Sequence, residues 1–96
     1  MSEQENRELT QIRNQISFGL DVEAFMRSDI GRYLTARANS DRQTALEALK
    51  DTDAEDPKAI RKLQNAALCA ECFLLWMGEA VSEGQNAQQA FTEAQD

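Results

Sequence analysis

Apolar residues recur at intervals of three and four along the first quarter of the chain. The members of this stripe are Leu9, Ile12, Ile16 and Leu20, with Phe25 near the same face. Such spacing is that of one face of an α-helix, and it predicts an amphipathic helix over residues 4–27. Gly19 weakens the middle of this helix by about 1 kcal/mol relative to alanine, unless a neighbouring backbone packs closely there.

A thinner, alanine-rich stripe follows and predicts a second helix over residues 29–50. Its members are Ile30, Tyr33, Leu34, Ala38, Ala45, Leu46 and Leu49. Ser28 is a suitable N-cap, and Asp29 places a negative charge at the positive end of the helix. Because so few residues separate the two stripes, we expect two helices joined by a tight elbow rather than one bent helix.

The acidic segment 51–56 is the clearest loop, and a third helix is predicted after it over residues 57–83. Asp56 can cap this helix, and Pro57 suits its first turn, where the missing N–H group would have no intrahelical partner. The apolar positions then alternate between intervals of three and four: Ile60, Leu63, Ala67, Ala70, Leu74, Met77 and Val81. This spacing is heptad-like.

The third helix is expected to stop at Gly84, since glycine is common just beyond a helix C-terminus. Residues 85–96 then form a tail, which either frays or holds a short helix capped by Asn86. The short loop makes the second and third helices antiparallel neighbours, and the first helix completes the set. We therefore predict one all-α domain over residues 1–96: a three-helix antiparallel bundle, or a helical hairpin with an additional N-terminal helix, which forms an oligomer.

The middle of the third predicted helix is apolar around almost its whole circumference. A helical wheel of residues 66–77 gives one ordinary core face. It also gives a second apolar face, made of Leu68, Cys69, Cys72, Leu75 and Trp76. Two other helices of a monomer would cover roughly half of the circumference, and a helix that is apolar all round is ordinarily buried all round. We therefore expect the second face to bind another copy of the chain.

Polar residues at the two ends of this second face favour a symmetric contact. Arg61 and Asn65 lie toward one end, and Glu79 and Glu83 toward the other. In a two-fold antiparallel dimer, Arg61 of one chain would approach Glu79 of the other, with Leu68 near Cys72 between them. The predicted interface is therefore Leu68, Cys72, Leu75 and Trp76, with Arg61 and Glu79 at its rim. The alternative is a monomer in which the first helix covers this face.

Composition excludes several classes of function. The chain has no histidine, which removes histidine bases and the common zinc ligand sets. Ten basic and seventeen acidic residues leave a net charge of −7, so we expect no direct binding to nucleic acid. The longest apolar run, residues 66–77, is shorter than the roughly 20 residues of a membrane span. With two cysteines and a polar N-terminus, a reducing cytoplasm is the expected compartment.

Two motifs resemble chemical sites but lack the residues that such sites need. Cys69 and Cys72 have CxxC spacing, but they lie mid-helix with no basic neighbour and no second pair, as two small side chains in an apolar seam would. The acidic loop resembles the start of a calcium loop, but Asp56 stands where glycine is required and Lys62 where a bidentate glutamate is required. We expect no catalytic residue, no metal and no cofactor.

Two groups of residues carry a family resemblance. They are Phe18-Gly19, Val22-Glu23, Phe25, Ser28-Asp29-Ile30-Gly31-Arg32-Tyr33-Leu34 and Arg37-Ala38, followed by Ala59-Ile60-Arg61, Leu63-Gln64-Asn65, Glu71, Trp76, Glu79-Ala80 and Gly84. In these residues the chain resembles short, all-helical proteins encoded in tailed-bacteriophage and prophage genomes. The resemblance implies a phage setting, in the bacterial host cytoplasm or associated with the virion.

Taken with the second apolar face, this setting predicts a non-enzymatic protein that self-associates, most simply as a homodimer. Its expected task is protein–protein contact in virion assembly or packaging, with a phage structural or packaging protein as a further partner. The net charge of −7 keeps one alternative open. In that alternative the chain is an acidic inhibitor or DNA mimic that binds a nucleic-acid-binding protein of the host.

Overall fold

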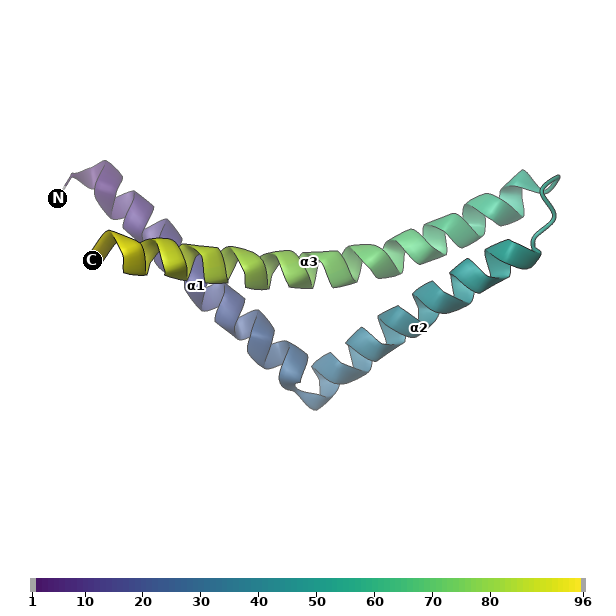
Figure 1. Cartoon of the computed structure of the whole chain (residues 1–96), viewed down its shortest axis with the longest axis horizontal. Helices are drawn as coiled ribbons and strands as arrows, with labels where there is room; N and C mark the ends of the chain where they lie inside the picture. Colours follow the sequence, from purple (N-terminus) through teal and green to yellow (C-terminus); the bar gives the residue numbers. More distant parts are fainter. Residues whose placement is uncertain (1, 96) are drawn as a thin grey trace. The chain divides into compact units, whose positions relative to one another are not determined.

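The computed structural model describes residues 2–95, and these form three α-helices with short connections (Figure 1). Helix α1 spans Glu3–Arg27, α2 spans Asp29–Asp51 and α3 spans Pro57–Gln95. No strand occurs among the described residues. The predicted all-α class is confirmed, and the bounds of the first two helices lie within one residue of the predicted ones.

The end of α3 differs from the prediction. The helix does not stop at Gly84 but continues to Gln95, and Asn86 lies inside it rather than capping a separate helix. Gly84 is buried against α1, where an added Cβ atom would lie 3.0 Å from the carbonyl oxygen of Gln15 and 3.0 Å from the Cα atom of Gly19. Glycine is therefore needed here for close packing of two backbones, not for ending the helix.

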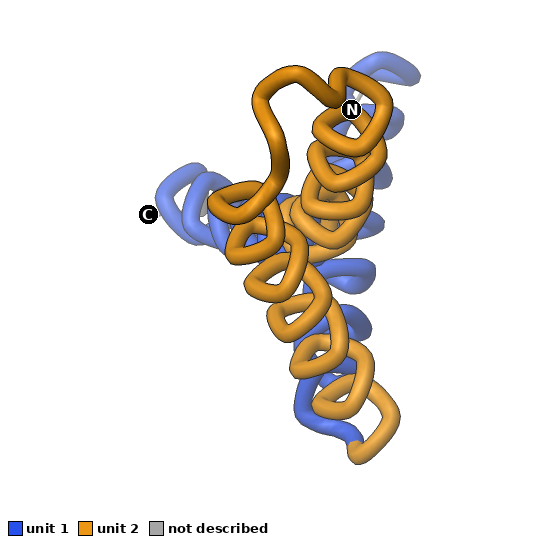
Figure 2. The backbone as a smooth tube through the Cα atoms, turned by 90° about the vertical axis from the view of Figure 1, so that its right-hand side faces the viewer, with its two compact units in different colours: residues 1–28, 77–96 blue, residues 29–76 orange. Residues whose placement is uncertain are grey.

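The chain divides into two compact units (Figure 2). Unit 1 consists of α1, Ser28 and the part of α3 from Met77 onward, and unit 2 consists of Asp29–Trp76. Each unit contains two helical segments, and α3 contributes to both. The predicted arrangement of three helices around one core is not confirmed.

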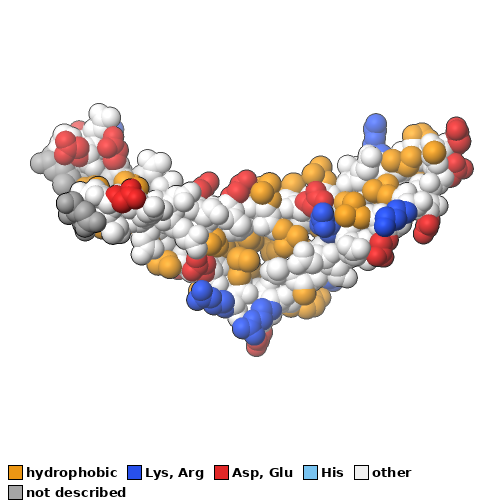
Figure 3. Space-filling model, in the orientation of Figure 1, with side chains coloured by type: hydrophobic (Ala, Val, Ile, Leu, Met, Phe, Trp, Pro, Cys, Tyr) orange, Lys and Arg blue, Asp and Glu red, His pale blue; other side chains and the backbone are white. Residues whose placement is uncertain are grey.

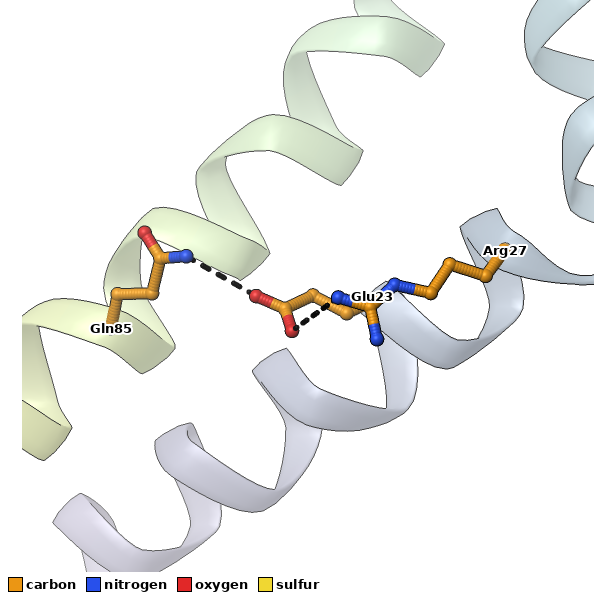
Figure 4. Close-up of polar contacts among 3 residues, drawn as sticks. All are labelled: Glu23, Arg27 and Gln85. Carbon is orange, nitrogen blue, oxygen red and sulfur yellow. Dashed lines mark hydrogen bonds and ion pairs between the residues drawn. The ribbon is translucent and has the colours of Figure 1, made fainter.

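Unit 1 is held by a crossing of α1 and α3 at their glycines. A Cβ atom on Gly19 would lie 2.9 Å from the Cα atom of Gly84, so the neighbouring backbone that Gly19 needs is present. Beside the crossing, Gln85 donates a hydrogen bond of 3.2 Å to Glu23, whose other carboxylate oxygen lies 3.8 Å from Arg27 (Figure 4). Val22 of α1 is buried in the same unit.

Unit 2 is a hairpin in which α2 and the first part of α3 run antiparallel (Figures 1 and 2). Its buried hydrophobic residues are Ala38, Ala45 and Ala67. The predicted helix start is confirmed, because a carboxylate oxygen of Asp56 accepts a hydrogen bond of 3.1 Å from the N–H group of Ala59. One ion pair links the two helices, with 2.9 Å between Nε of Arg42 and a carboxylate oxygen of Glu71.

Ser28 separates α1 from α2. Its backbone is extended, and its hydroxyl and N–H groups both donate to the carbonyl oxygen of Phe25 at the end of α1. The two stripes of the sequence are therefore two helices and not one bent helix. The sequence pointed to Ser28 as the N-cap of α2, and the bonds described above place it at the end of α1.

Candidate functional site

The described core consists of small side chains. The buried hydrophobic residues are Val22, Ala38, Ala45, Ala67 and Ala87, and no described side chain is completely buried. A pair of helices shares one face, so the remaining apolar residues of each unit stay at the surface. The large hydrophobic residues that are at least one-third exposed are Phe18, Leu20, Ile30, Tyr33, Leu34, Leu68, Leu75 and Trp76.

Three of these exposed residues lie on one side of α3 in unit 2. Leu68, Leu75 and Trp76 expose 56%, 57% and 62% of their surface, and Cys72 between them is half-buried. We call these four residues the outer face of α3. Hydrophobic side chains reach the surface on the side of α3 that faces away from α2 (Figure 3).

The two residues predicted at the rim of this face are both exposed. Arg61 belongs to unit 2, whereas Glu79 belongs to unit 1. Both belong to α3, and in the sequence they stand before and after the four apolar residues. The structure thus gathers the four apolar residues on one side of α3 within unit 2.

An open depression of about 620 Å³ adjoins the outer face. It is lined by Arg42 of α2 and by Leu68, Glu71, Cys72, Leu74 and Leu75 of α3. The ion pair of Arg42 with Glu71 borders it, and the two side chains are 42% and 43% exposed. Sequence reasoning missed Arg42, because its partner is 29 residues away and only the register of the α2–α3 hairpin brings the two together.

The other side of unit 2 carries a second apolar groove, of about 280 Å³. Leu34, Ala38, Cys69 and Phe73 are among the residues that line it. Of the stripe that predicted α2, Ile30 and Tyr33 are in fact exposed, because α3 covers only one side of α2.

Arg37 makes two polar contacts on the exposed side of α2. Arg37 donates a hydrogen bond of 3.3 Å to the hydroxyl of Tyr33 and lies 3.4 Å from a carboxylate oxygen of Asp41. The bond to Tyr33 and the charge of Asp41 raise the pKa of Arg37. Arginine is already fully charged at neutral pH, so these contacts leave its charge unchanged.

The two motifs with possible chemical roles occupy ordinary structural positions. Cys69 is exposed and Cys72 half-buried, and both thiols are free. In the acidic loop, Asp53 accepts a hydrogen bond of 2.9 Å from the N–H group of Glu55, as Asp56 does from α3. Within residues 2–95 no group of three or more cysteines and carboxylates is placed to hold a metal ion.

No helix in the described part of the chain is both long and apolar enough to cross a membrane. No protein-family model, curated protein or solved structure matches the chain. The fold and the candidate site therefore define a class only: a small all-helical protein with an exposed apolar face on its longest helix.

Proposed function

We propose that the chain is a non-enzymatic, self-associating protein that acts by protein–protein contact through the outer face of α3. The observation that carries this proposal is the exposure of Leu68, Leu75 and Trp76, each more than half accessible to solvent. The opposite side of the same helix packs on α2 within unit 2. Large apolar residues gathered on one face are typical of a protein-binding surface.

The exposed apolar residues alone do not make a tight dimer. Full burial of a large apolar side chain stabilises by about 1.5–3 kcal/mol, and roughly half of each of the three side chains is still available for burial. Association itself costs about 4–15 kcal/mol. Neighbouring residues must therefore contribute, and we expect a weak dimer rather than one of nanomolar affinity.

Self-association also covers the side of α3 that α2 leaves open. Two α2–α3 hairpins, joined through their α3 helices, form a row of four helices in which each α3 packs against one helix on either side. In a phage setting, such a dimer would act in virion assembly or packaging, in the host cytoplasm or on the virion. The family resemblance of the sequence supports this setting.

Sedimentation velocity over about 1–500 μM protein tests the proposal, since this range brackets micromolar affinity. We expect the wild type to dimerise, and Trp76→Glu and Leu75→Glu to be monomeric, because each places a carboxylate in an apolar contact. Phe18→Glu is the matched control, since Phe18 is 61% exposed but lies in unit 1. A wild type that stays monomeric throughout the range contradicts the proposal.

The partner is tested separately, by pull-down from phage-infected host lysate with the wild type and with Trp76→Glu. Capture of virion or packaging proteins supports the assembly role. Capture of a host DNA-binding protein, undiminished by Trp76→Glu, supports instead the acidic inhibitor that the net charge of −7 allows.

A further inference from the structure

Residues 60–79 of α3 carry two seams on different sides of the helix. The inner seam is buried or half-buried in unit 2: Ile60, Leu63, Ala67, Ala70 and Leu74. The outer seam repeats at intervals of four and three and is exposed apart from half-buried Cys72: Arg61, Asn65, Leu68, Cys72, Leu75 and Glu79. At 100° per residue the seams lie about 140° apart around the helix. A helix that has heptad spacing on two sides can pack against a different helix on each of those sides.

The depression beside the outer seam has the geometry of a coiled-coil hole. Leu68, Glu71, Cys72 and Leu75 among its lining residues stand at positions i, i+3, i+4 and i+7. In coiled coils, four residues at this spacing surround each side chain that is inserted from the facing helix. Three apolar or weakly polar walls and one ion-paired carboxylate suit an aliphatic side chain.

We infer, resting on the proposed self-association, that a second copy binds α3 antiparallel, with Leu68 of each copy inserted into the depression of the other. A two-fold axis then requires each contact to occur twice. Leu68 faces Cys72 of the second copy, and the other facing pairs follow along the seam: Asn65 with Leu75, and Arg61 with Glu79. The opposite charges at the two ends of the seam make a second copy the complementary occupant.

If the two α3 helices are shifted by one heptad or placed parallel, the facing residues are no longer complementary. A shift by one heptad in one direction sets Leu68 opposite Glu79, which buries a carboxylate against an aliphatic side chain, and leaves Arg61 opposite the uncharged Asn86. A shift in the other direction sets Arg61 opposite Cys72. A parallel pair faces Arg61 with Arg61 and Glu79 with Glu79, and like charges repel.

In this register, the ion pair that α2 contributes to the depression lies near the dimer axis. The two Glu71 side chains come to lie on the flank of the dimer near its axis, one from each copy. Each is held at 2.9 Å by Arg42 of its own hairpin. The second copy therefore meets two ion pairs rather than two unpaired carboxylates.

A charge-reversal series tests the register, with the self-association constant measured by sedimentation equilibrium. Arg61→Glu and Glu79→Arg each replace two opposite-charge contacts by two like-charge contacts, so each is expected to raise the dissociation constant about 10-fold. The double variant Arg61→Glu/Glu79→Arg rebuilds both ion pairs and should return to within about 3-fold of the wild type. Both residues are exposed, and circular dichroism verifies that every variant is helical.

The matched control pairs Arg61→Glu with Glu83→Arg. Glu83 is also exposed and lies one turn beyond Glu79, but it does not face Arg61 in this register, so no recovery is expected. A dimeric wild type with no effect of the single changes, or with recovery by Glu83→Arg instead of Glu79→Arg, overturns the register and leaves the proposed self-association standing. A monomeric wild type overturns both.

Discussion

Gly19 and Gly84 bring two backbones into contact in unit 1. Substitution of Gly84 by alanine adds a Cβ atom 3.0 Å from two backbone atoms of α1, and backbone cannot move aside without separating the helices. Overpacking of this kind costs about 1–3 kcal/mol, more than the roughly 1 kcal/mol that alanine gains in helix propensity. We expect Gly84→Ala to lower the free energy of unfolding, as measured by urea denaturation at one fixed protein concentration.

Gly78 is the control for this prediction, because it lies in the same helix with nothing within 4 Å of an added Cβ atom. Gly78→Ala should stabilise the protein by about 0.5–1 kcal/mol through helix propensity alone. Equal stability of the two alanine variants would show that the glycine crossing does not hold unit 1 together.

These two glycines also mark how far local sequence reasoning reaches. For Gly19 the sequence allowed two alternatives, a weakened helix or a close approach of a neighbouring backbone. The structure shows the close approach. Gly84 was assigned to the end of a helix, wrongly, because a glycine just beyond a helix and a glycine at a helix crossing look alike in the local sequence. Only its partner, 65 positions earlier in the chain, distinguishes the two.

At the scale of the element, the start of α3 depends on Asp56. Its carboxylate accepts the N–H group of Ala59 in the first turn. Asp56→Ala removes this cap and should destabilise unit 2 by about 1 kcal/mol, seen as a lower midpoint of thermal unfolding and faster hydrogen exchange at the start of α3. Glu55→Ala removes the same charge from the same loop, where Glu55 uses its backbone N–H group. It should change the midpoint far less, and an equal change would argue against capping.

The helices themselves were accessible from the sequence, since spacing, caps and loop residues are local properties. The bounds of α1 and α2 and the start of α3 follow from them. The pairing of Arg42 with Glu71 and the division into two units do not. They depend on how two helices are rotated and aligned against each other, and the sequence of one helix does not contain this information.

At the scale of the whole molecule, the surface that the sequence pointed to is one of those that the described chain leaves exposed. A wheel of α3 alone showed more apolar circumference than the chain can shield, and Leu68, Leu75 and Trp76 are indeed exposed. What the wheel could not supply is the contribution of α2. Arg42 reaches the edge of the outer face and neutralises Glu71 there, so the hairpin and the proposed dimer contact share one ion pair.

Removal of Arg42 should therefore affect association more than folding. The pair is about four-tenths exposed, so its loss should cost the hairpin less than about 1 kcal/mol. In the dimer, Arg42→Ala leaves two unpaired carboxylates near the axis, and we expect the dissociation constant to rise about 3–10-fold, most strongly at low salt. The further change Glu71→Gln removes the repulsion and should restore association, while Arg37→Ala, on the other groove of unit 2, should have no effect. Recovery that fails in Arg42→Ala/Glu71→Gln would mean that Arg42 contributes through packing of its side chain rather than through its charge.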